Sequence, residues 1–358
     1  MSMRDVARLG DGRPLRRKIM AMKICIIGAG AIGGLLGAKL ALAGETVTFV
    51  EVDAIQREAI NNNGLKLLMH SGEELVAKNV RAFPDTSGPG PQDLVILAVK
   101  AHHIAEVAAG LKSLYTPDTM VMTVQNGIPW WYFQRHGGPL DGTRLKSVDP
   151  DGVISANIDP ARIIGCVVFP AASVVAPGVI KHEEGDRFSV GELDGSKSNR
   201  LQGIYNMLVA AGFKSFLLDN VRSEIWLKAW GNLSFNPISA LTHEGMEGIA
   251  RFPLTRDLSV KMMEEAQRVA NKLGITFRHT IAKRIEGAEA VGPHKTSMLQ
   301  DVEAGHSLEV EALVGSIVEL GQLTQMPTPQ IDSVYACTKL LDKVMREQHA
   351  AVVLESVG

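Results

Sequence analysis

The sequence predicts an α/β protein: a doubly wound sheet domain at the N-terminus, followed by an all-α domain at the C-terminus. Strand-like and helix-like segments alternate from Lys23 onward, which is typical of a parallel sheet. A glycine-rich turn joins the first strand to the first helix. Beyond Asp219 the apolar residues recur at helical spacing, with no strand-like alternation of comparable strength.

The length and composition support two domains and exclude several classes of partner. A chain of 358 residues is longer than one hydrophobic core usually serves. The 37 basic and 39 acidic residues give a net charge of −2, and no long run of one sign predicts nucleic acid or a membrane surface as a partner. Three cysteines are too few and too scattered for a disulfide framework or a zinc site, which favours a reducing cytoplasm and no bound metal. No apolar run approaches the ~20 residues of a membrane span.

The first 21 residues are Arg-rich, and no apolar segment resembling a signal sequence follows them. We expect residues 1–21 to be a disordered extension and the fold to begin at Met22. Cys25 lies in the first apolar strand, where we expect it to be part of the core.

The first strand–helix–strand unit reads KICIIGAGAIGGLLGAKLALAGETVTFVE. Gly28, Gly30 and Gly33 form G-x-G-x-x-G between strand and helix. The first glycine permits the tight turn, the second lets a pyrophosphate approach the backbone, and the third lets the helix pack on the strand. The helix start, at Ala31 and Ile32, would hold the anion. This context predicts a Rossmann-like dinucleotide-binding domain, to which we assign residues 22–218.

An acidic residue, Glu51, ends the second strand 18 residues after Gly33. In dinucleotide-binding domains a carboxylate at this point hydrogen-bonds to the ribose hydroxyls. Further strands are predicted at 93–100 and 119–127, with a helix from about 103 to 114 between them. Lys100 and Asn126 stand at the carboxyl ends of these strands, where doubly wound sheets bind ligands. Simple turn chemistry is the alternative for both residues.

The segment 128–164 is a long loop that opens with the aromatic run Trp130 to Phe133. It could be a lid or a pocket wall, but we slightly favour an anchor that packs the loop down. After it, the segments GCVVFPAASVV, GVIKHEE and RFSVGEL are expected to add antiparallel strands to the sheet. Residues 219–350 are expected to form a helical domain for substrate binding and dimerisation, with long helices at 221–241, 258–273, 297–323 and 333–346.

The helix-like stretch EIWLKAWGNLSFNP carries a polar ridge on an otherwise apolar segment. Lys228, Asn232 and Asn236 are four residues apart and therefore lie above one another on one helix face. A solvated face is one interpretation. Asn, however, is a poor helix former, so two of them beside a lysine also fit a set of hydrogen-bonding groups kept for a ligand.

From Met22 to about Met345 the chain resembles the ketopantoate reductase (2-dehydropantoate 2-reductase) family. The motifs that carry the resemblance are GAGAIG, AVK, QNG, EIWLKAWGNLSFNP and SMLQDVEAGHSLEVE. The resemblance implies that Lys228 is the general acid and that Glu309 assists it. It also implies that Asn126 contacts the lysine.

By the same resemblance, Asn232 and Asn236 bind the substrate, Ser297 binds its carboxylate, and Lys100 lies at the cleft between cofactor and substrate. These roles agree with the chemistry. Hydride transfer to a ketone leaves negative charge on oxygen, which a nearby ammonium can stabilise and protonate. A carboxylate such as Glu309 would keep a partly buried ammonium charged.

The chain departs from the family pattern at the cofactor. The resemblance implies NADP(H), whose 2′-phosphate is usually bound by an Arg after the second strand, but here Glu51, Val52 and Asp53 follow. An acidic residue there repels a phosphate, so a preference for NAD(H) is the alternative. The usual Thr-Glu and Asn-Gly pairs are Leu308-Glu309 and Val314-Gly315 here, and the loop after Asn126 is about twenty residues longer than typical.

The sequence therefore predicts a reductase that converts 2-dehydropantoate to pantoate in pantothenate synthesis. Its expected partner is a small 2-keto acid, and a homodimer is possible. The nearest alternative is an NAD-dependent 2-hydroxy acid dehydrogenase of the same family, with a bulkier substrate against Trp130 to Phe133. A dinucleotide-sensing module without catalysis is the rival from another class. Lys228 and Glu309 together argue against it, because a sensor needs no acid and no partner for the acid.

Overall fold

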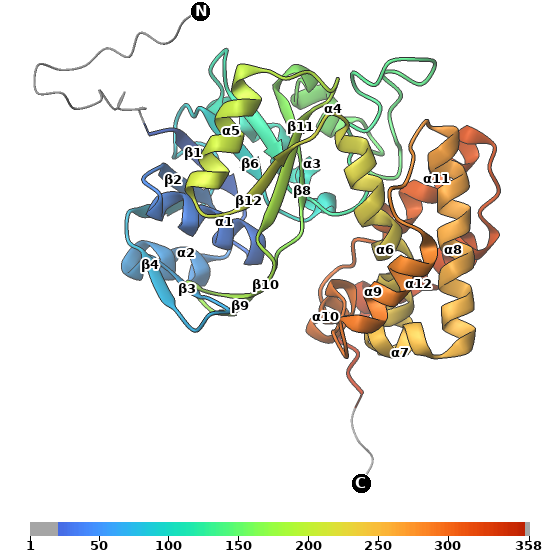
Figure 1. The fold of residues 1–358 in the computed structure, drawn as a ribbon. Coiled ribbons are helices and arrows are strands. Elements are labelled where there is room, and N and C mark those ends of the chain that lie inside the picture. The colour runs from blue at the N-terminus through green and yellow to red at the C-terminus, as the bar shows by residue number, and fades with distance from the viewer. Residues whose placement is uncertain (1–20, 355–358) are drawn as a thin grey trace, which may run out of the picture.

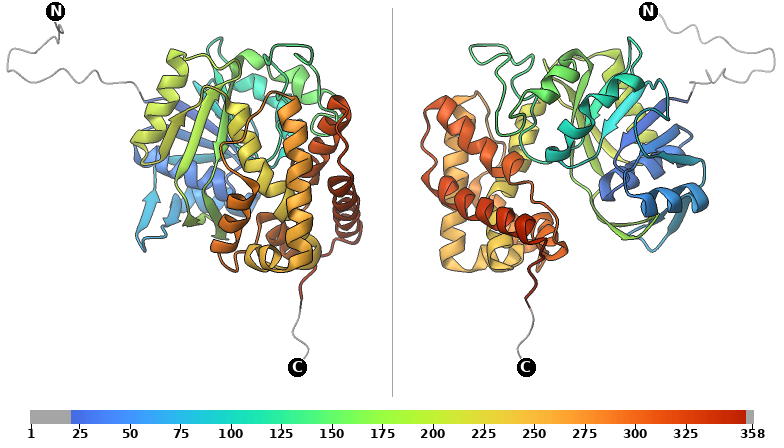
Figure 2. Two further views of the ribbon diagram at one scale, coloured as in Figure 1. Left: turned by 45° about the vertical axis from the view of Figure 1, so that its right-hand side comes forward. Right: turned by 180° about the vertical axis from the view of Figure 1, so that it is seen from behind.

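The computed structural model describes residues 21–354, which form a sheet domain and a helical domain side by side (Figure 1). The last strand of the sheet domain, β12, ends at Leu217, and the first helix of the helical domain, α6, begins at Val221. Figure 2 shows the same division from two other sides. The predicted disordered extension lies, up to residue 20, outside the described residues.

The main sheet has eight strands in the order β12-β11-β8-β7-β6-β1-β2-β5. All neighbouring strands are parallel except β8 and β11, so the predicted doubly wound sheet is confirmed. The strands are β1 (Lys23–Ile27), β2 (Thr46–Val50), β5 (Val80–Phe83), β6 (Leu94–Leu97), β7 (Met120–Thr123), β8 (Ile163–Val168), β11 (Arg187–Glu192) and β12 (Lys214–Leu217).

The side chains of β1 alternate between two hydrophobic cores, because successive residues of a strand point to opposite faces. Ile24 and Ile26 pack with α1 and α5 on one face, whereas Cys25 and Ile27 belong to the core on the other face. The second core continues into the helical domain, where it includes Trp226. The expected core position of Cys25 is confirmed.

Short helices and turns link the strands of the sheet domain. They are α1 (Ala31–Leu42), α2 (Ala54–Asn63), η1 (Ala101–His103), α3 (Ile104–Ala108), η2 (Gly110–Leu114), α4 (Val153–Asn157), η3 (Pro160–Arg162) and α5 (Asn199–Ala210). The single helix predicted from about 103 to 114 is thus divided into α3 and two flanking 3₁₀ turns. Its apolar residues Ile104, Leu111 and Leu114 are nevertheless buried against the sheet.

A second sheet, in the order β4-β3-β10-β9, corrects one expectation. Its strands are β3 (Leu65–Leu68), β4 (Glu74–Ala77), β9 (Ala171–Ala176) and β10 (Val179–Glu184). Of the strands predicted to extend the main sheet, only β8 and β11 do so; β9 and β10 form a hairpin that pairs with β3 instead. The sequence showed their strand character but not their partner, which depends on a distant segment.

The helical domain consists of α6 (Val221–Thr242), α7 (Met246–Arg251), α8 (Pro253–Lys272), α9 (Ile281–Ala290), α10 (Ser297–Ala304), the π-helical turn η4 (Glu311–Gly315), α11 (Ser316–Thr324) and α12 (Pro329–Gln348). The continuous helix predicted over 297–323 is wrong. Gly305 adopts a left-handed conformation, with φ +68°, and ends α10. The chain then becomes helical again at η4 and continues as α11.

The aromatic residues of the long loop are anchors. Trp130, Trp131, Tyr132 and Phe133 are at most 3% exposed and belong to the core shared with the helical domain. The Trp226 indole on α6 donates a hydrogen bond to the Tyr132 hydroxyl at 2.7 Å. The favoured interpretation of this run is confirmed, and no aromatic pocket wall is formed by it. Between residues 21 and 354, no helix is long and apolar enough to cross a membrane.

Candidate active site

The glycine turn after β1 has the shape that a bound pyrophosphate requires. Gly28 has φ +99°, which L side chains rarely adopt. A Cβ on Gly33 would lie 2.0 Å from the Gly28 carbonyl oxygen, so only glycine lets α1 pack on the turn. A Cβ on Gly30, by contrast, would meet nothing within 4 Å. The backbone at Gly30 is therefore open to a ligand.

The start of α1 leaves main-chain donors available at the same place. Gly30 precedes the helix and supplies no side-chain cap, so the amides at Ala31 and Ile32 have no side chain bound to them at this end. Uncapped amides and the helix dipole favour an anion there. The turn and the helix start thus have the open backbone that a pyrophosphate would need, and binding at this place stays a prediction.

Glu51 follows β2 and is fixed beside this turn. Its carboxylate accepts hydrogen bonds from the Ala29 amide at 2.8 Å and the Asp53 amide at 3.0 Å. The Arg57 guanidinium is also held nearby, because it donates to the carbonyls of Glu51 and Val52 at 2.9 and 3.2 Å. The Val52 side chain is 79% exposed. This end of β2 therefore carries a fixed carboxylate, and the Arg57 guanidinium is held on the main-chain carbonyls beside it.

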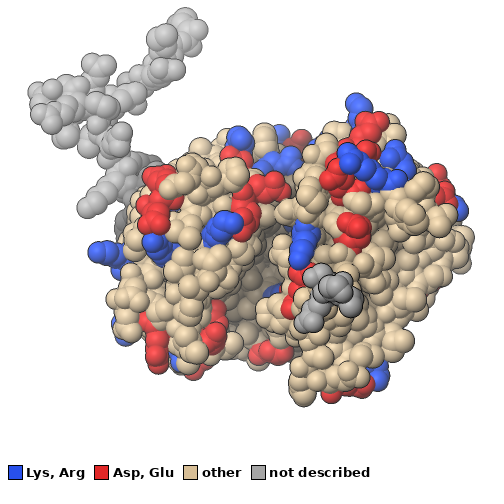
Figure 3. Space-filling model, turned by 90° about the horizontal axis from the view of Figure 1, so that it is seen from below, with Lys and Arg blue, Asp and Glu red and all other residues tan. Residues whose placement is uncertain are grey.

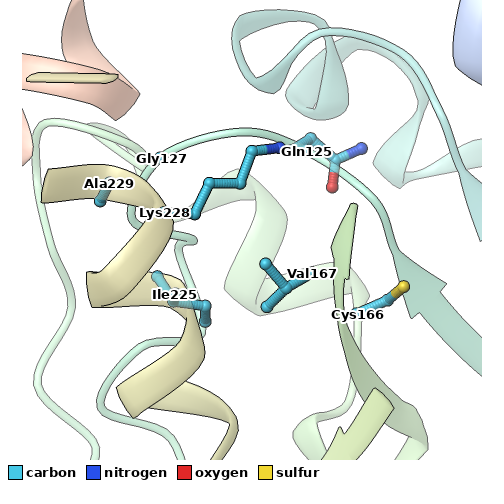
Figure 4. Close-up of a pocket in the computed structure, with 7 residues that line it drawn as sticks. All are labelled: Gln125, Gly127, Cys166, Val167, Ile225, Lys228 and Ala229. Atoms are coloured by element: carbon cyan, nitrogen blue, oxygen red, sulfur yellow. The ribbon is translucent and has the colours of Figure 1, made fainter. Parts of the chain in front are cut away.

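Lys228 projects from α6 toward the loop that follows β7 (Figure 4). Its ammonium donates to the Asn126 side-chain oxygen at 2.5 Å and to the Val168 carbonyl. The small cavity around it is lined by Gln125, Gly127, Cys166, Val167, Ile225, Lys228 and Ala229. The predicted contact between Lys228 and Asn126 is thus present, and it joins the two domains.

Glu309 approaches the same asparagine from the helical domain. Its carboxylate accepts a hydrogen bond from the Ala101 amide at 3.1 Å, and the nearby Asn126 side chain also lowers its pKa. Asn126 therefore stands between the ammonium of Lys228 and the carboxylate of Glu309. Ile128, two residues later, donates its amide to the Ala312 carbonyl of η4 at 2.9 Å, which holds this loop on the segment that carries Glu309.

Burial and charge shift the pKa of both groups. Burial lowers the pKa of Lys228 to about 8, against the attraction of Glu309, which raises it. Arg187 and Arg284 lower it further by repulsion. Burial likewise raises the pKa of the Glu309 carboxyl, opposed by its hydrogen bond from Ala101. An ammonium with a pKa near neutrality is suited to exchange a proton with a reacting oxygen.

The rest of the polar ridge faces α10. The Asn236 side-chain amide lies 3.5 Å from the Ser297 hydroxyl, and Asn236 is 7% exposed. Asn232 stands between Lys228 and Asn236 and is partly buried. The structure therefore places Lys228, Asn232, Asn236 and Ser297 along one side of α6, and the ridge is not a fully solvated face.

Lys100 takes part in a contact between the domains. Its ammonium pairs with the Asp301 carboxylate at 2.7 Å and donates to the Ser307 carbonyl at 3.2 Å. Lys100 thus lies at the boundary between the sheet and helical domains, and its ammonium already has a carboxylate partner. Its place at the cleft between cofactor and substrate stays a prediction. A space-filling view shows a hollow between the two domains, with both basic and acidic side chains at its edge (Figure 3).

The orientation of α6 is set by its first two turns. Asn220 caps the helix by accepting from the amides of Arg222 and Ser223. The Arg222 guanidinium donates to the carbonyls of Tyr132, Leu193 and Gln134. These bonds tie the helix that carries Lys228 to the sheet domain.

Three residues at this site were not singled out from the sequence. The Gln125 amide donates to the Leu97 and Val99 carbonyls, while its side-chain oxygen is buried with no hydrogen-bond partner among the described residues. That orphan acceptor beside Lys228 fits a ligand donor such as a carboxamide. Its place in the QNG motif was a signal for it. Asp301 and Arg284 carried no such signal, because their positions depend on packing between helices.

This fold and site define a two-domain oxidoreductase, in which a dinucleotide-binding sheet meets a helical domain that supplies a lysine and its carboxylate. Two family models match the chain: ketopantoate reductase PanE/ApbA over residues 24–195, and its C-terminal domain over residues 220–342. The chain therefore belongs to the ketopantoate reductase family.

Individual relatives agree with this assignment. A 2-dehydropantoate 2-reductase of Mesorhizobium japonicum is 50% identical over 320 residues, covering 89% of this chain and 98% of the relative. A protein from Ralstonia solanacearum, solved as a candidate ketopantoate reductase, superimposes with a TM-score of 0.86 at 38% identity, covering 91% of this chain and 99% of that one. A D-mandelate dehydrogenase solved with NADH and anilino(oxo)acetate has a TM-score of 0.77 at 22% identity, covering 91% and 99%, and shares the fold.

Proposed function

We propose that this protein reduces 2-dehydropantoate to pantoate with a reduced nicotinamide cofactor, in the synthesis of pantothenate. The observation that carries the proposal is the contact of Lys228 with Asn126, beside Glu309, in a chain 50% identical to a 2-dehydropantoate 2-reductase. The Gly28–Gly33 turn supports a dinucleotide at the adjoining edge of the sheet.

The residues of the site divide the chemistry between them. A bound reduced nicotinamide supplies a hydride to the keto carbon. The Lys228 ammonium stabilises the negative charge that develops on the keto oxygen and donates the proton that completes the hydroxyl. Glu309 keeps the lysine charged, and Asn126 holds the two groups in place. The neutral amine left on Lys228 then takes up a proton from solvent.

The remaining residues of the ridge orient the substrate. We assign Asn232 and Asn236 to the polar groups of the substrate and Ser297 to its carboxylate. Lys100 contributes to this site by holding Asp301 and the segment before Glu309 against the sheet domain. Gly28, Gly30, Ala31, Ile32 and Gly33 bind the pyrophosphate.

The residues that follow β2 indicate which of the two nicotinamide cofactors is preferred. Glu51 places a fixed carboxylate where the ribose of a dinucleotide would lie, which favours NADH. Arg57 is the cation nearest to that carboxylate along the chain, and it would have to leave two carbonyls to reach a 2′-phosphate. We therefore infer that NADH is used at least as well as NADPH.

The alternative of a bulky aromatic keto acid loses its structural basis. Its pocket wall was to be Trp130 to Phe133, and these residues are buried in the core. The relative at 50% identity also favours 2-dehydropantoate over other 2-keto acids. A small 2-keto acid is therefore the partner. A homodimer and a cytoplasmic location remain part of the proposal, the latter in keeping with three free cysteines.

Initial rates test the proposal directly. NADH and NADPH are each measured against 2-dehydropantoate and a panel of small and aromatic 2-keto acids. The proposal expects the highest kcat/KM for 2-dehydropantoate. A higher kcat/KM for another keto acid would show that the substrate is that keto acid, while the reaction would still be keto-acid reduction. If neither cofactor were oxidised with any keto acid, the proposed reaction itself would be contradicted.

A further inference from the structure

One basic side chain beside the ridge has no counter-charge. Arg284 lies on α9 and its guanidinium rests on Gly231 of α6: a Cβ on Gly231 would come within 2.2 Å of one guanidinium nitrogen. Burial lowers the pKa of Arg284, and no charged group within the described residues opposes that effect. Arg284 is only partly buried, and its guanidinium nitrogens still reach solvent. A partly desolvated charge without an ion-pair partner favours an anionic ligand.

The neighbouring charges are already matched. Arg187 and Arg278 both pair with the Glu224 carboxylate, at 3.1 and 2.8 Å. Lys100 is engaged by Asp301, and Glu309 faces Lys228. Arg222 on α6 has no carboxylate partner either, but its guanidinium donates to three carbonyls. Among the described residues beside the polar ridge, Arg284 is therefore the cation with neither kind of partner. An anionic substrate would balance it.

The position of Arg284 along α6 fits a group attached directly to the keto carbon. Gly231 is three residues from Lys228, or ~4.5 Å along the helix axis. In a 2-keto acid the carboxylate carbon is bonded to the keto carbon. A carboxylate near the level of Gly231 would leave the keto oxygen close to Lys228.

We propose that Arg284 binds the carboxylate of the 2-keto acid, together with Ser297, and so sets the preference of the site for acids over neutral ketones. This inference rests on the proposed function and names the group that recognises the anionic end of its substrate. The planar guanidinium matches a carboxylate with two parallel N–H donors.

The test compares 2-dehydropantoate with its neutral primary amide. Arg284→Gln is expected to lower kcat/KM for the acid at least tenfold, mostly through KM, and to change kcat/KM for the amide less than threefold. Arg284→Lys should recover part of the loss, because it restores charge without the paired donors. Lys283→Gln, an exposed neighbour on α9, is the matched control and should leave both substrates unchanged.

A second variant guards against misfolding of Arg284→Gln. Gly231→Ala places a methyl where the guanidinium rests, at a helical position that tolerates alanine. It should lower kcat/KM for the acid more than kcat/KM for the amide. Equal losses for acid and amide in both variants, or no loss in either, would overturn the assignment of Arg284. A wild-type protein that reduces no keto acid would instead overturn the proposed function.

Discussion

Replacing Glu309 by Gln should move the pH dependence of the reaction in a direction that the structure fixes. Lys228 must be protonated to act as an acid, and its pKa is about 8. The rate of keto-acid reduction at saturating substrate is therefore expected to fall above pH 8, to about a tenth of its plateau at pH 9. The attraction of Glu309 raises this pKa, so its removal must lower it.

The size of the displacement follows from the charges. A nearby opposite charge typically changes a pKa by ~1–3 pH units. We take the lower figure, because Asn126 stands between the two groups. Glu309→Gln should then shift the alkaline limb from pH 8 toward ~7. When each rate is expressed as a fraction of that enzyme's own low-pH plateau, the rate of Glu309→Gln at pH 8 should be ~5-fold lower than that of the wild type.

The assay is kcat for cofactor oxidation across the pH range, with Glu319→Gln as a control. Glu319 accepts hydrogen bonds from Lys146 and Ser147, away from Lys228, so its loss should leave the limb in place. Pantoate oxidation should show the opposite trend and rise with pH, since it needs the neutral amine. A limb that stays at pH 8 in Glu309→Gln, or moves to higher pH, would refute the reasoning.

Three other variants test separate parts of the structure. Val52→Arg should raise the ratio of kcat/KM for NADPH over NADH about tenfold or more, because it adds a charge-assisted donor beside the ribose. Val175→Arg, on the second sheet, is the control and should leave this ratio unchanged. An unchanged ratio in Val52→Arg would show that the ribose does not lie at this end of β2. Tyr132→Phe leaves the Trp226 indole without its acceptor and should cost ~1–3 kcal/mol in the free energy of unfolding, measured by urea denaturation. Trp131→Ala should cost ~3–5 kcal/mol and leave the ranking of keto acids unchanged, whereas a tenfold re-ranking would return this residue to the substrate pocket.

Much of the sheet domain could be predicted because its signals are local. Each buried strand is a short apolar run, and the glycine turn at Gly28 to Gly33 imposes backbone conformations that few other residues adopt. The pairing of β9 and β10 with β3 could not be predicted in this way. Strand propensity is read from neighbouring residues, whereas the choice of partner is decided by contacts across more than a hundred positions.

The helical domain shows a similar limit. Helical periodicity continues through Gly305, and it gave no sign that the left-handed glycine would end α10 and that η4 would restart the helix. This break is what brings Glu309 to Asn126, so the prediction of one long helix missed the feature that completes the site. The short helix α9, which carries Arg284, was also absent from the expected elements.

The candidate site was predictable as a set of residue types at fixed spacing along α6. Lys228, Asn232 and Asn236 share one face as expected, and Asn126 meets the lysine. The engagement of Lys100 by Asp301 and the uncompensated charge of Arg284 follow only from how the domains and helices pack. Neither could be read from one segment alone.

The most direct test of the account is the rate of 2-dehydropantoate reduction by Lys228→Ala, with binding of the reduced cofactor followed by its fluorescence. The account predicts a fall in kcat of at least ~100-fold with cofactor affinity retained, because general acid catalysis typically contributes 10²–10⁴-fold. Lys214→Ala, at the edge of the sheet, should behave as wild type. A Lys228→Ala variant that keeps more than roughly a tenth of the wild-type kcat would contradict the role of Lys228 as the proton donor.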